Sequence, residues 1–235
     1  TELIDSYKSV MEAFVHAGVE NNARVNIKWI KTEKIKNLKD VGKVFSNING
    51  VLILPGFGSR GSEGKIKIVK YSRENKVPFF GICLGLQCAV IEFARNVCKM
   101  QGANSTEFNS KTQYPVIDLM ESQRAIKIKG GTMRLGAYEC EIKRGTKAYS
   151  AYRRKKISER HRHRYEVNNR YKKTLEKNGM VFSGINQELR VVETIEVKNH
   201  PWFIASQFHP ELKSRINKAH PLFREFIKAA VKNSL

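Results

Sequence analysis

The chain has 235 residues, 41% of them hydrophobic and 28% charged, which describes an ordinary globular protein long enough to bury a sizeable core. No apolar run approaches the roughly 20 residues that cross a bilayer, and residues 1–10 lack the basic start and apolar centre of a signal peptide. Its 43 Lys and Arg exceed 22 Asp and Glu, and the net charge of +21 either attracts polyanions or, spread over solvated faces, keeps the protein soluble.

Hydrophobic periodicity predicts that strands and helices alternate in the first part of the chain. In chain order we expect a helix at 5–17, an alternating strand at 24–30, a buried strand at 50–54, a helix at 62–75, a buried strand at 77–82 and a helix at 84–97. Wholly apolar strands are typical of a parallel sheet covered on both faces. The pattern therefore predicts an α/β fold, with a doubly wound, mainly parallel sheet and flanking helices.

Beyond residue 115 the predicted strands are short, which indicates an additional antiparallel strand region. They are expected at 125–128, 132–135, 139–142, 180–185, 191–197 and 203–207, followed by a last helix at 221–232. Since no internal repeat, low-complexity segment or linker is visible, residues 1–235 are predicted to form a single domain. The first helix has no strand ahead of it, so we expect the chain to begin inside that domain.

A glycine-rich loop follows the predicted strand at 50–54, in the stretch GVLILPGFGSRGSEGK. Its G-x-G-x-x-G, from Gly56 to Gly61, lacks the acidic residue about twenty positions further on that a dinucleotide fingerprint requires. A phosphate-binding P-loop fails as well, because it would need glycine at Ser59 and a hydroxyl at Ile66. A third role remains, a turn whose bare N–H groups face a reacting carbonyl.

The next strand leads into Gly81-Ile82-Cys83-Leu84-Gly85, the thiol version of the G-x-S-x-G nucleophile elbow. Small flanking residues let the strand and the helix approach, while the sharp turn strains the backbone of the nucleophile. The helix N-terminus favours a thiolate at Cys83, and the N–H of Leu84 can donate to an oxyanion. The plainer alternative is a small core cysteine packed between two glycines.

A base for this thiol is available in the stretch FIASQFHPEL, after the predicted strand at 203–207. His209 can take the thiol proton and return it to a leaving group, while Glu211 can fix the tautomer and support the imidazolium. A lone histidine at a strand end is usually structural, but an elbow cysteine in the same fold favours a catalytic role. We therefore predict a triad of Cys83, His209 and Glu211.

The four cysteines, Cys83, Cys88, Cys98 and Cys140, form neither a C-x-x-C pair nor a cluster with histidine. No disulfide framework, zinc site or other metal site is therefore expected, and a reducing, cytoplasmic setting fits best. The non-enzyme alternative is a polyanion or nucleic-acid binder, because the run YRRKKISERHRHRYE at 152–166 mixes arginine, lysine and tyrosine. No RNA-binding motif is visible, so we expect neither nucleic acid nor membrane as a partner.

Together these residues resemble the class I (triad) glutamine amidotransferases and, within that class, the glutaminase domains of CTP synthases. GICLGLQ and QFHPE carry the resemblance to the class, and the closer resemblance rests on DSYKSVMEAFVHAG, GFGSRGSEGKI, ANSTEF, GGTMRLG, ERHRHRYEVNN and HPWFIASQFHPELKSR. These segments run across nearly the whole chain. The resemblance implies hydrolysis of L-glutamine to glutamate and ammonia through a cysteine thioester, with the ammonia serving the amination of UTP to CTP in pyrimidine biosynthesis.

The resemblance also implies catalytic roles for single residues. Cys83 would attack the side-chain amide of glutamine, His209 would be the general acid and base, and Glu211 would orient that histidine. The backbones of Gly56 and Leu84 would form the oxyanion hole and line the substrate site. The glycine loop would then hold a tetrahedral intermediate.

Further residues match positions that hold the substrate in this family. Gln87, Glu107 and Arg164 would bind the α-amino and α-carboxylate groups of glutamine, because a carboxylate suits an ammonium and a guanidinium suits a carboxylate. Arg60, in SRGSEGK, would contribute to a lid loop that responds to GTP. One departure stands out: Pro55 replaces the first glycine of the family's loop and removes one N–H donor, although the donor expected in the oxyanion hole belongs to Gly56.

By the same resemblance, an N-terminal synthetase domain absent from this chain would bind ATP, UTP and Mg and receive the ammonia through a channel. The glutaminase domain itself would need no cofactor, GTP would be an allosteric effector, and the full-length enzyme would be a homo-oligomer. The rival enzymes are a γ-glutamyl hydrolase and the glutaminase of another synthase. SRGSEGK, ANSTEF and RHRHRYEVN argue against both.

Overall fold

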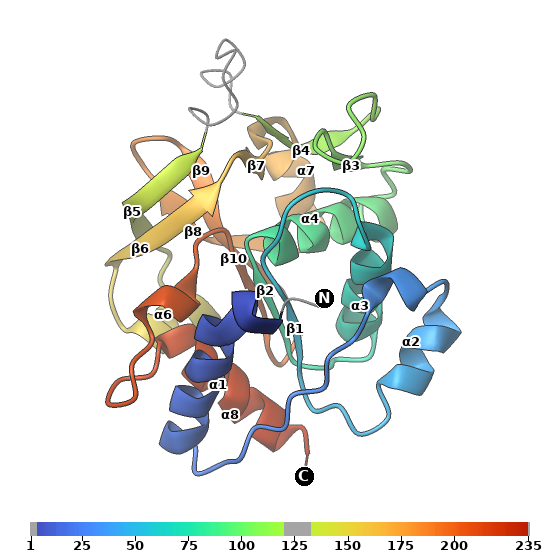
Figure 1. Cartoon of the computed structure of the whole chain (residues 1–235). Helices are drawn as coiled ribbons and strands as arrows, with labels where there is room; N and C mark the ends of the chain where they lie inside the picture. Colours follow the sequence, from blue (N-terminus) through green and yellow to red (C-terminus); the bar gives the residue numbers. More distant parts are fainter. Residues whose placement is uncertain (1–3, 120–132, 235) are drawn as a thin grey trace.

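The computed structural model describes residues 4–119 and 133–234 (Figure 1). Its helices are α1 (Lys8–Glu20), α2 (Leu38–Val44), α3 (Ser62–Glu74), α4 (Leu84–Asn96), α6 (Lys147–Tyr152), α7 (Lys172–Lys177) and α8 (Pro221–Lys232), with 3-10 turns η1 (Ile4–Tyr7), η2 (Thr32–Lys34), η4 (Asn169–Tyr171) and η5 (Pro210–Lys213). Its strands are β1 (Val51–Ile53), β2 (Phe79–Ile82), β3 (Asn104–Ser105), β4 (Pro115–Leu119), β5 (Arg134–Ile142), β6 (Lys156–His163), β7 (Tyr165–Val167), β8 (Met180–Asn186), β9 (Val191–Val197) and β10 (Phe203–Ser206).

The main sheet has seven strands in the order β1-β2-β10-β9-β8-β5-β6. Strands β1, β2 and β10 pair in parallel, and from β10 outward through β9, β8, β5 and β6 the pairings are antiparallel. A separate sheet of three strands has the order β3-β4-β7. The predicted α/β fold is confirmed, and its parallel layer and antiparallel region turn out to share one sheet.

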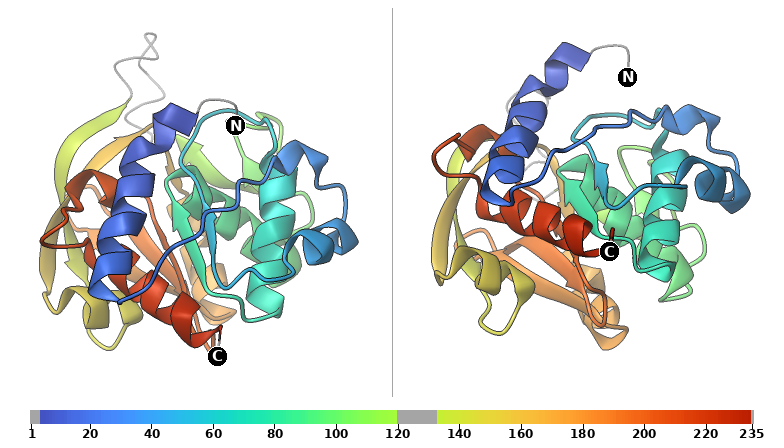
Figure 2. Two further views of the ribbon diagram at one scale, coloured as in Figure 1. Left: turned by 60° about the horizontal axis from the view of Figure 1, so that its bottom comes forward. Right: turned by 90° about the horizontal axis from the view of Figure 1, so that it is seen from below.

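Helices cover both faces of this sheet, as the views in Figure 2 show. Strand β2 is buried along its whole length, and its successive side chains point to opposite faces. Phe79 stacks on Phe203 in the core on the α3 and α4 side, with ring centroids 4.4 Å apart. Phe80 packs edge-on against Phe223 of α8, in the core that α8 shares with α1. These two cores explain why the strand reads as a continuous apolar run.

The predicted strand at 24–30 is wrong, since this segment is assigned no regular structure. Its residues line one groove of about 800 Å³ together with residues of β1, which is the edge strand of the sheet. A strand needs a neighbour for its N–H and C=O groups, and the alternation of Val25, Ile27 and Trp29 cannot supply one.

Two further expectations change in the antiparallel region. The predicted strand at 125–128 lies outside the described residues, and the expected pair at 132–135 and 139–142 is instead the single strand β5. The basic run at 152–166 contains β6, in which buried Glu159, His161 and His163 alternate with exposed residues. Much of its positive charge therefore lies on the solvent side of an amphipathic strand. Within residues 4–119 and 133–234, no helix is long and apolar enough to cross a membrane.

Candidate active site

Three neighbouring parallel strands bring the predicted site together. The glycine loop follows β1, Cys83 follows β2 and His209 follows β10 after a short turn. The carboxyl ends of parallel strands meet at one edge of a sheet, where open α/β sheets place their ligands. Residues from three distant parts of the sequence therefore converge at this edge.

Cys83 occupies a strained turn between β2 and α4. Its backbone has φ 53° and ψ −100°, outside the regions that a non-glycine residue prefers, and its N–H donates to the carbonyl of Ser206 at 2.7 Å. A Cβ on Gly81 would lie 2.8 Å from the backbone of Gly85, and one on Gly85 would lie 2.5 Å from the carbonyl oxygen of Ile53. Only glycine therefore fits on either side of the turn, as the predicted elbow requires.

Gly56 and Leu84, the two residues predicted to form the oxyanion hole, are neighbours in the structure. A Cβ built on Gly56 would be 3.3 Å from the side chain of Leu84, so the glycine loop passes directly beside the start of α4. The N–H of Leu84 belongs to the first turn of that helix, whose donors have no partner within the helix. Cys83 itself is only 2% exposed.

His209 and Glu211 form a buried pair beside the elbow. Nδ1 of His209 lies 2.7 Å from Oε1 of Glu211, while Nε2 is buried and makes no hydrogen bond within the described residues. Burial alone would lower the pKa of His209, but its interactions with Cys83 and Glu211 outweigh burial and raise that pKa above its ordinary value. Because Nδ1 is held by Glu211, Nε2 is the ring nitrogen left to exchange a proton with the thiol.

Replacing the carboxylate of Glu211 by an amide, Glu211→Gln, should lower the pKa of His209, because the imidazolium loses its charged partner. A raised histidine pKa stabilises the fold below the ordinary value of about 6.5, and this contribution is lost as the pH rises through the folded-state value. In the variant this contribution should be smaller, and its loss should be complete at a lower pH. An NMR titration of the His209 ring measures the shift, and an unchanged midpoint would contradict the pairing.

The predicted substrate residues Gln87, Glu107 and Arg164 come from separate elements, and one of them contacts the glycine loop. Oε1 of Glu107 accepts the N–H of Gly58 at 2.8 Å, and Arg164 lies close enough to Glu107 for its charge to act on that carboxyl group. Burial raises the pKa of Glu107 although both neighbours oppose the rise. Gln87 is buried and donates to the carbonyl of Tyr165 at 3.2 Å, which ties α4 to the segment that carries Arg164. Glu107 therefore contacts the loop directly, and the charge of Arg164 acts on Glu107 from a separate element.

Arg60 lies on the surface, unlike the predicted substrate residues. Its side chain is 80% exposed and pairs with Glu33 at 3.0 Å, so this ion pair ties it to η2 and not to the triad. Gly58 and Gly61 on either side of it have positive φ, which only glycine adopts readily. In the part of the chain that the structure describes, no group of three or more His, Cys, Asp or Glu side chains could hold a metal ion.

Sequence comparison agrees with this arrangement. The profile of the glutamine amidotransferase class-I family matches residues 2–229. The chain belongs to this family. It is 59% identical to a CTP synthase of Pelodictyon phaeoclathratiforme and 56% identical to one of Chlorobaculum tepidum, in both cases over 98% of this chain. The chain spans 41% of the length of each of these relatives.

Among solved structures, this amidotransferase chain is similar to the glutaminase domain of Trypanosoma brucei CTPS with bound acivicin. The TM-score is 0.91 at 34% identity, and the match covers 97% of this chain and 89% of that one. A Thermoplasma acidophilum protein described as a putative GMP synthase component matches over 95% of this chain and 89% of its own, with a TM-score of 0.63 at 15% identity. That second match indicates a shared fold and no more.

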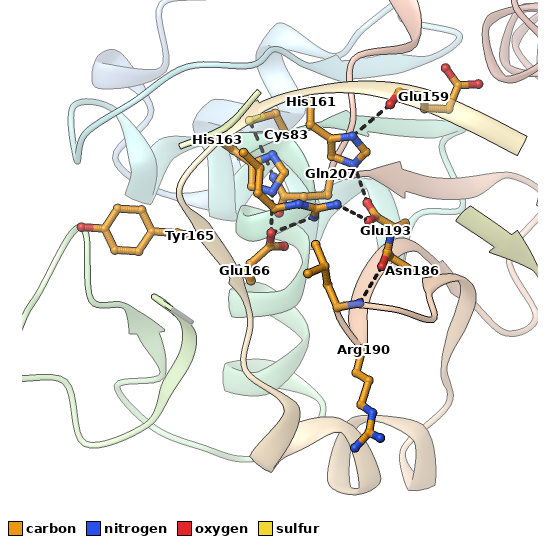
Figure 3. Close-up of polar contacts among 12 residues, drawn as sticks. Cys83, Glu159, His161, His163, Tyr165, Glu166, Asn186, Arg190, Glu193 and Gln207 are labelled. Carbon is orange, nitrogen blue, oxygen red and sulfur yellow. Dashed lines mark hydrogen bonds and ion pairs between the residues drawn. The ribbon is translucent and has the colours of Figure 1, made fainter. Parts of the chain in front are cut away.

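Sequence reasoning missed two features of this amidotransferase domain, both visible in Figure 3. Gln207 donates from Nε2 to Sγ of Cys83 at 3.7 Å. The second feature is a set of buried ionisable side chains, the buried ion cluster, formed by Arg134, His161, His163, Glu166 and Glu193. One indication was available: in an extended segment, residues two apart share a face, so Gln207 and His209 could have been expected on the same side.

Proposed function

We propose that this chain, as a single domain over residues 1–235, hydrolyses L-glutamine to glutamate and ammonia. The observation that carries the proposal is the strained cysteine at a strand-to-helix turn with a buried histidine–carboxylate pair at the end of the adjacent strand. Cys83, His209 and Glu211 supply a nucleophile, a base and an orienting group from neighbouring parallel strands. A purely structural cysteine would gain nothing from a strained backbone with positive φ, which costs free energy.

The reaction has two halves. Sγ of Cys83 attacks the side-chain carbonyl carbon of glutamine, the oxyanion forms, and the C–N bond breaks as His209 donates its proton to the departing ammonia. Water then adds to the thioester, with His209 taking its proton, and the C–S bond breaks to release glutamate and the thiolate. The N–H groups of Gly56 and Leu84 would stabilise both oxyanions, since each lies beside the elbow.

Recognition of free glutamine would fall to the residues around the loop. Glu107 suits the α-ammonium group and Arg164 the α-carboxylate, and Gln87 holds the segment next to Arg164 through Tyr165. The contact of Glu107 with Gly58 would couple substrate binding to the position of the oxyanion loop. Opening of this loop is the step we infer for substrate entry, because Cys83 is nearly covered.

We further infer that the ammonia serves the conversion of UTP to CTP, because CTP synthases are 59% and 56% identical to this chain over 98% of its length. ATP, UTP and Mg would then bind in a synthetase part outside this chain, in a cytoplasmic homo-oligomer. GTP would act as an effector through the loop around Arg60, whose exposed guanidinium pairs with Glu33.

Covalent labelling with a glutamine-like diazo-ketone tests the proposed function. The reagent should modify Cys83 alone, and free glutamine should protect the thiol, because both compete for one site. Peptide mapping by mass spectrometry identifies the modified residue. Labelling of Cys98, which is partly exposed, or labelling that glutamine does not reduce, would refute the catalytic assignment.

A further inference from the structure

Gln207 is placed against the nucleophile by the sheet itself. It directly follows Ser206, the last residue of β10, which pairs with Ile82 beside the elbow. Its side chain is fully buried, and Nε2 lies 3.7 Å from Sγ of Cys83 (Figure 3). Among the described residues, sulfur is the only hydrogen-bond partner of this amide.

The amide is poorly explained by packing. Oε1 of Gln207 is buried and accepts no hydrogen bond from any described residue. Burying a half-satisfied amide costs free energy that methionine or leucine of similar size would avoid. Buried polar atoms normally have a hydrogen-bond partner, and exceptions are expected at functional sites. The unpaired amide oxygen beside the nucleophile therefore indicates a functional constraint on Gln207.

Hydrogen bonding to the neighbouring strand β9 fixes the position of Gln207. Its backbone N–H donates to the carbonyl of Glu193 at 2.8 Å. The carboxylate of Glu193 is held in turn by Arg134 at 2.8 Å and by His161 at 2.6 Å, and all three side chains are buried. The amide therefore reaches the sulfur from a backbone that is hydrogen-bonded to β9, as a positioning group needs.

We propose that Gln207 is a positioning residue that donates a hydrogen bond to the thiolate of Cys83. The contact strengthens with charge on sulfur, so it favours the thiolate over both the thiol and the thioester. It therefore aids the thiolate that attacks glutamine and the thiolate that leaves when water cleaves the thioester. The proposal rests on the function proposed above, because it assumes that Cys83 is the nucleophile.

The test measures thiolate formation directly. In Gln207→Met, which keeps the length of the side chain but loses the donor, the pH midpoint of the thiolate ultraviolet absorbance should rise. The rate of Cys83 alkylation by iodoacetamide near neutral pH should fall about tenfold, the effect of losing one hydrogen bond to a charged group. Gln207→Glu, with an acceptor in place of the donor, should lower the rate further. Wild-type midpoints and rates in both variants would overturn the proposal.

Matched variants separate this effect from other causes. Asn186→Leu removes another buried amide, one that bonds to Glu139 and Leu189, and should leave alkylation of Cys83 unchanged. Thermal unfolding shows whether each variant is folded, and Gln207→Glu keeps the test open if the methionine variant is not. Because alkylation needs no glutamine turnover, failure of the glutaminase assignment would appear in the labelling experiment. Failure of the Gln207 assignment alone would leave glutamine protection intact and the alkylation profile unshifted.

Discussion

Cys83→Ala should abolish glutamine hydrolysis, lowering the rate by about a millionfold or to the limit of detection. Removing the sulfur eliminates the thioester, and no other thiol is placed to replace it: Cys88 and Cys140 are fully buried in the core, and Cys98 is partly exposed beyond the end of α4. Glutamine binding should survive, since Glu107 and Arg164 are untouched. The measurements are ammonia release and the change in thermal stability on adding glutamine.

Two further variants, Cys98→Ala as a control and His209→Ala in the predicted base, test the same mechanism. Cys98→Ala should retain full activity, because that side chain lies outside the elbow. His209→Ala should be about as damaging as Cys83→Ala, and the double variant no worse than either, since nucleophile and base act as a unit. Activity in Cys83→Ala close to that of the wild type would refute the mechanism. Additive losses in the double variant would mean that His209 acts elsewhere.

Sequence patterns correctly predicted the elements whose conformation depends on interactions between residues close in the sequence. The elbow follows from Gly81 and Gly85, because strand and helix cannot approach with a side chain at either position. The helix at 221–232 was predicted with its observed bounds, since proline at its first position and a strong apolar stripe define it. The strand at 24–30 failed because its alternation is local whereas a strand needs a neighbour.

The site was predictable to the same extent. The triad could be proposed because Cys83 and His209 each follow an apolar strand, and parallel strands end together. The buried ion cluster could not be predicted from the sequence, because its members come from β5, β6, β7 and β9. The sequence of a single strand does not show which charges will face one another. In the sequence, His161 and His163 resembled part of a basic surface run.

Arg134→Met should be the most destabilising single change in the buried ion cluster. The guanidinium lies 2.9 Å from Glu166 and 2.8 Å from Glu193, and all three side chains are at most 4% exposed. Removing it leaves two carboxylates buried without their common cation, which costs about 3–5 kcal/mol of unfolding free energy. Lys70→Met, which breaks the more exposed pair with Glu74, is the matched control and should cost no more than about 1 kcal/mol.

The loss in Arg134→Met should also depend on pH in a definite direction. Burial alone would raise the pKa of Glu166, but His163 and Arg134 outweigh burial and lower it. A carboxyl group whose pKa is lowered by folding stabilises the fold at pH values above the ordinary carboxyl pKa. That contribution disappears as the pH falls through the folded-state pKa. Without Arg134 this pKa rises, so the difference from wild type should be largest near neutral pH and shrink on acidification. Urea unfolding across this range measures it. A difference that grows in acid would mean that Arg134 does not stabilise the ionised form of Glu166.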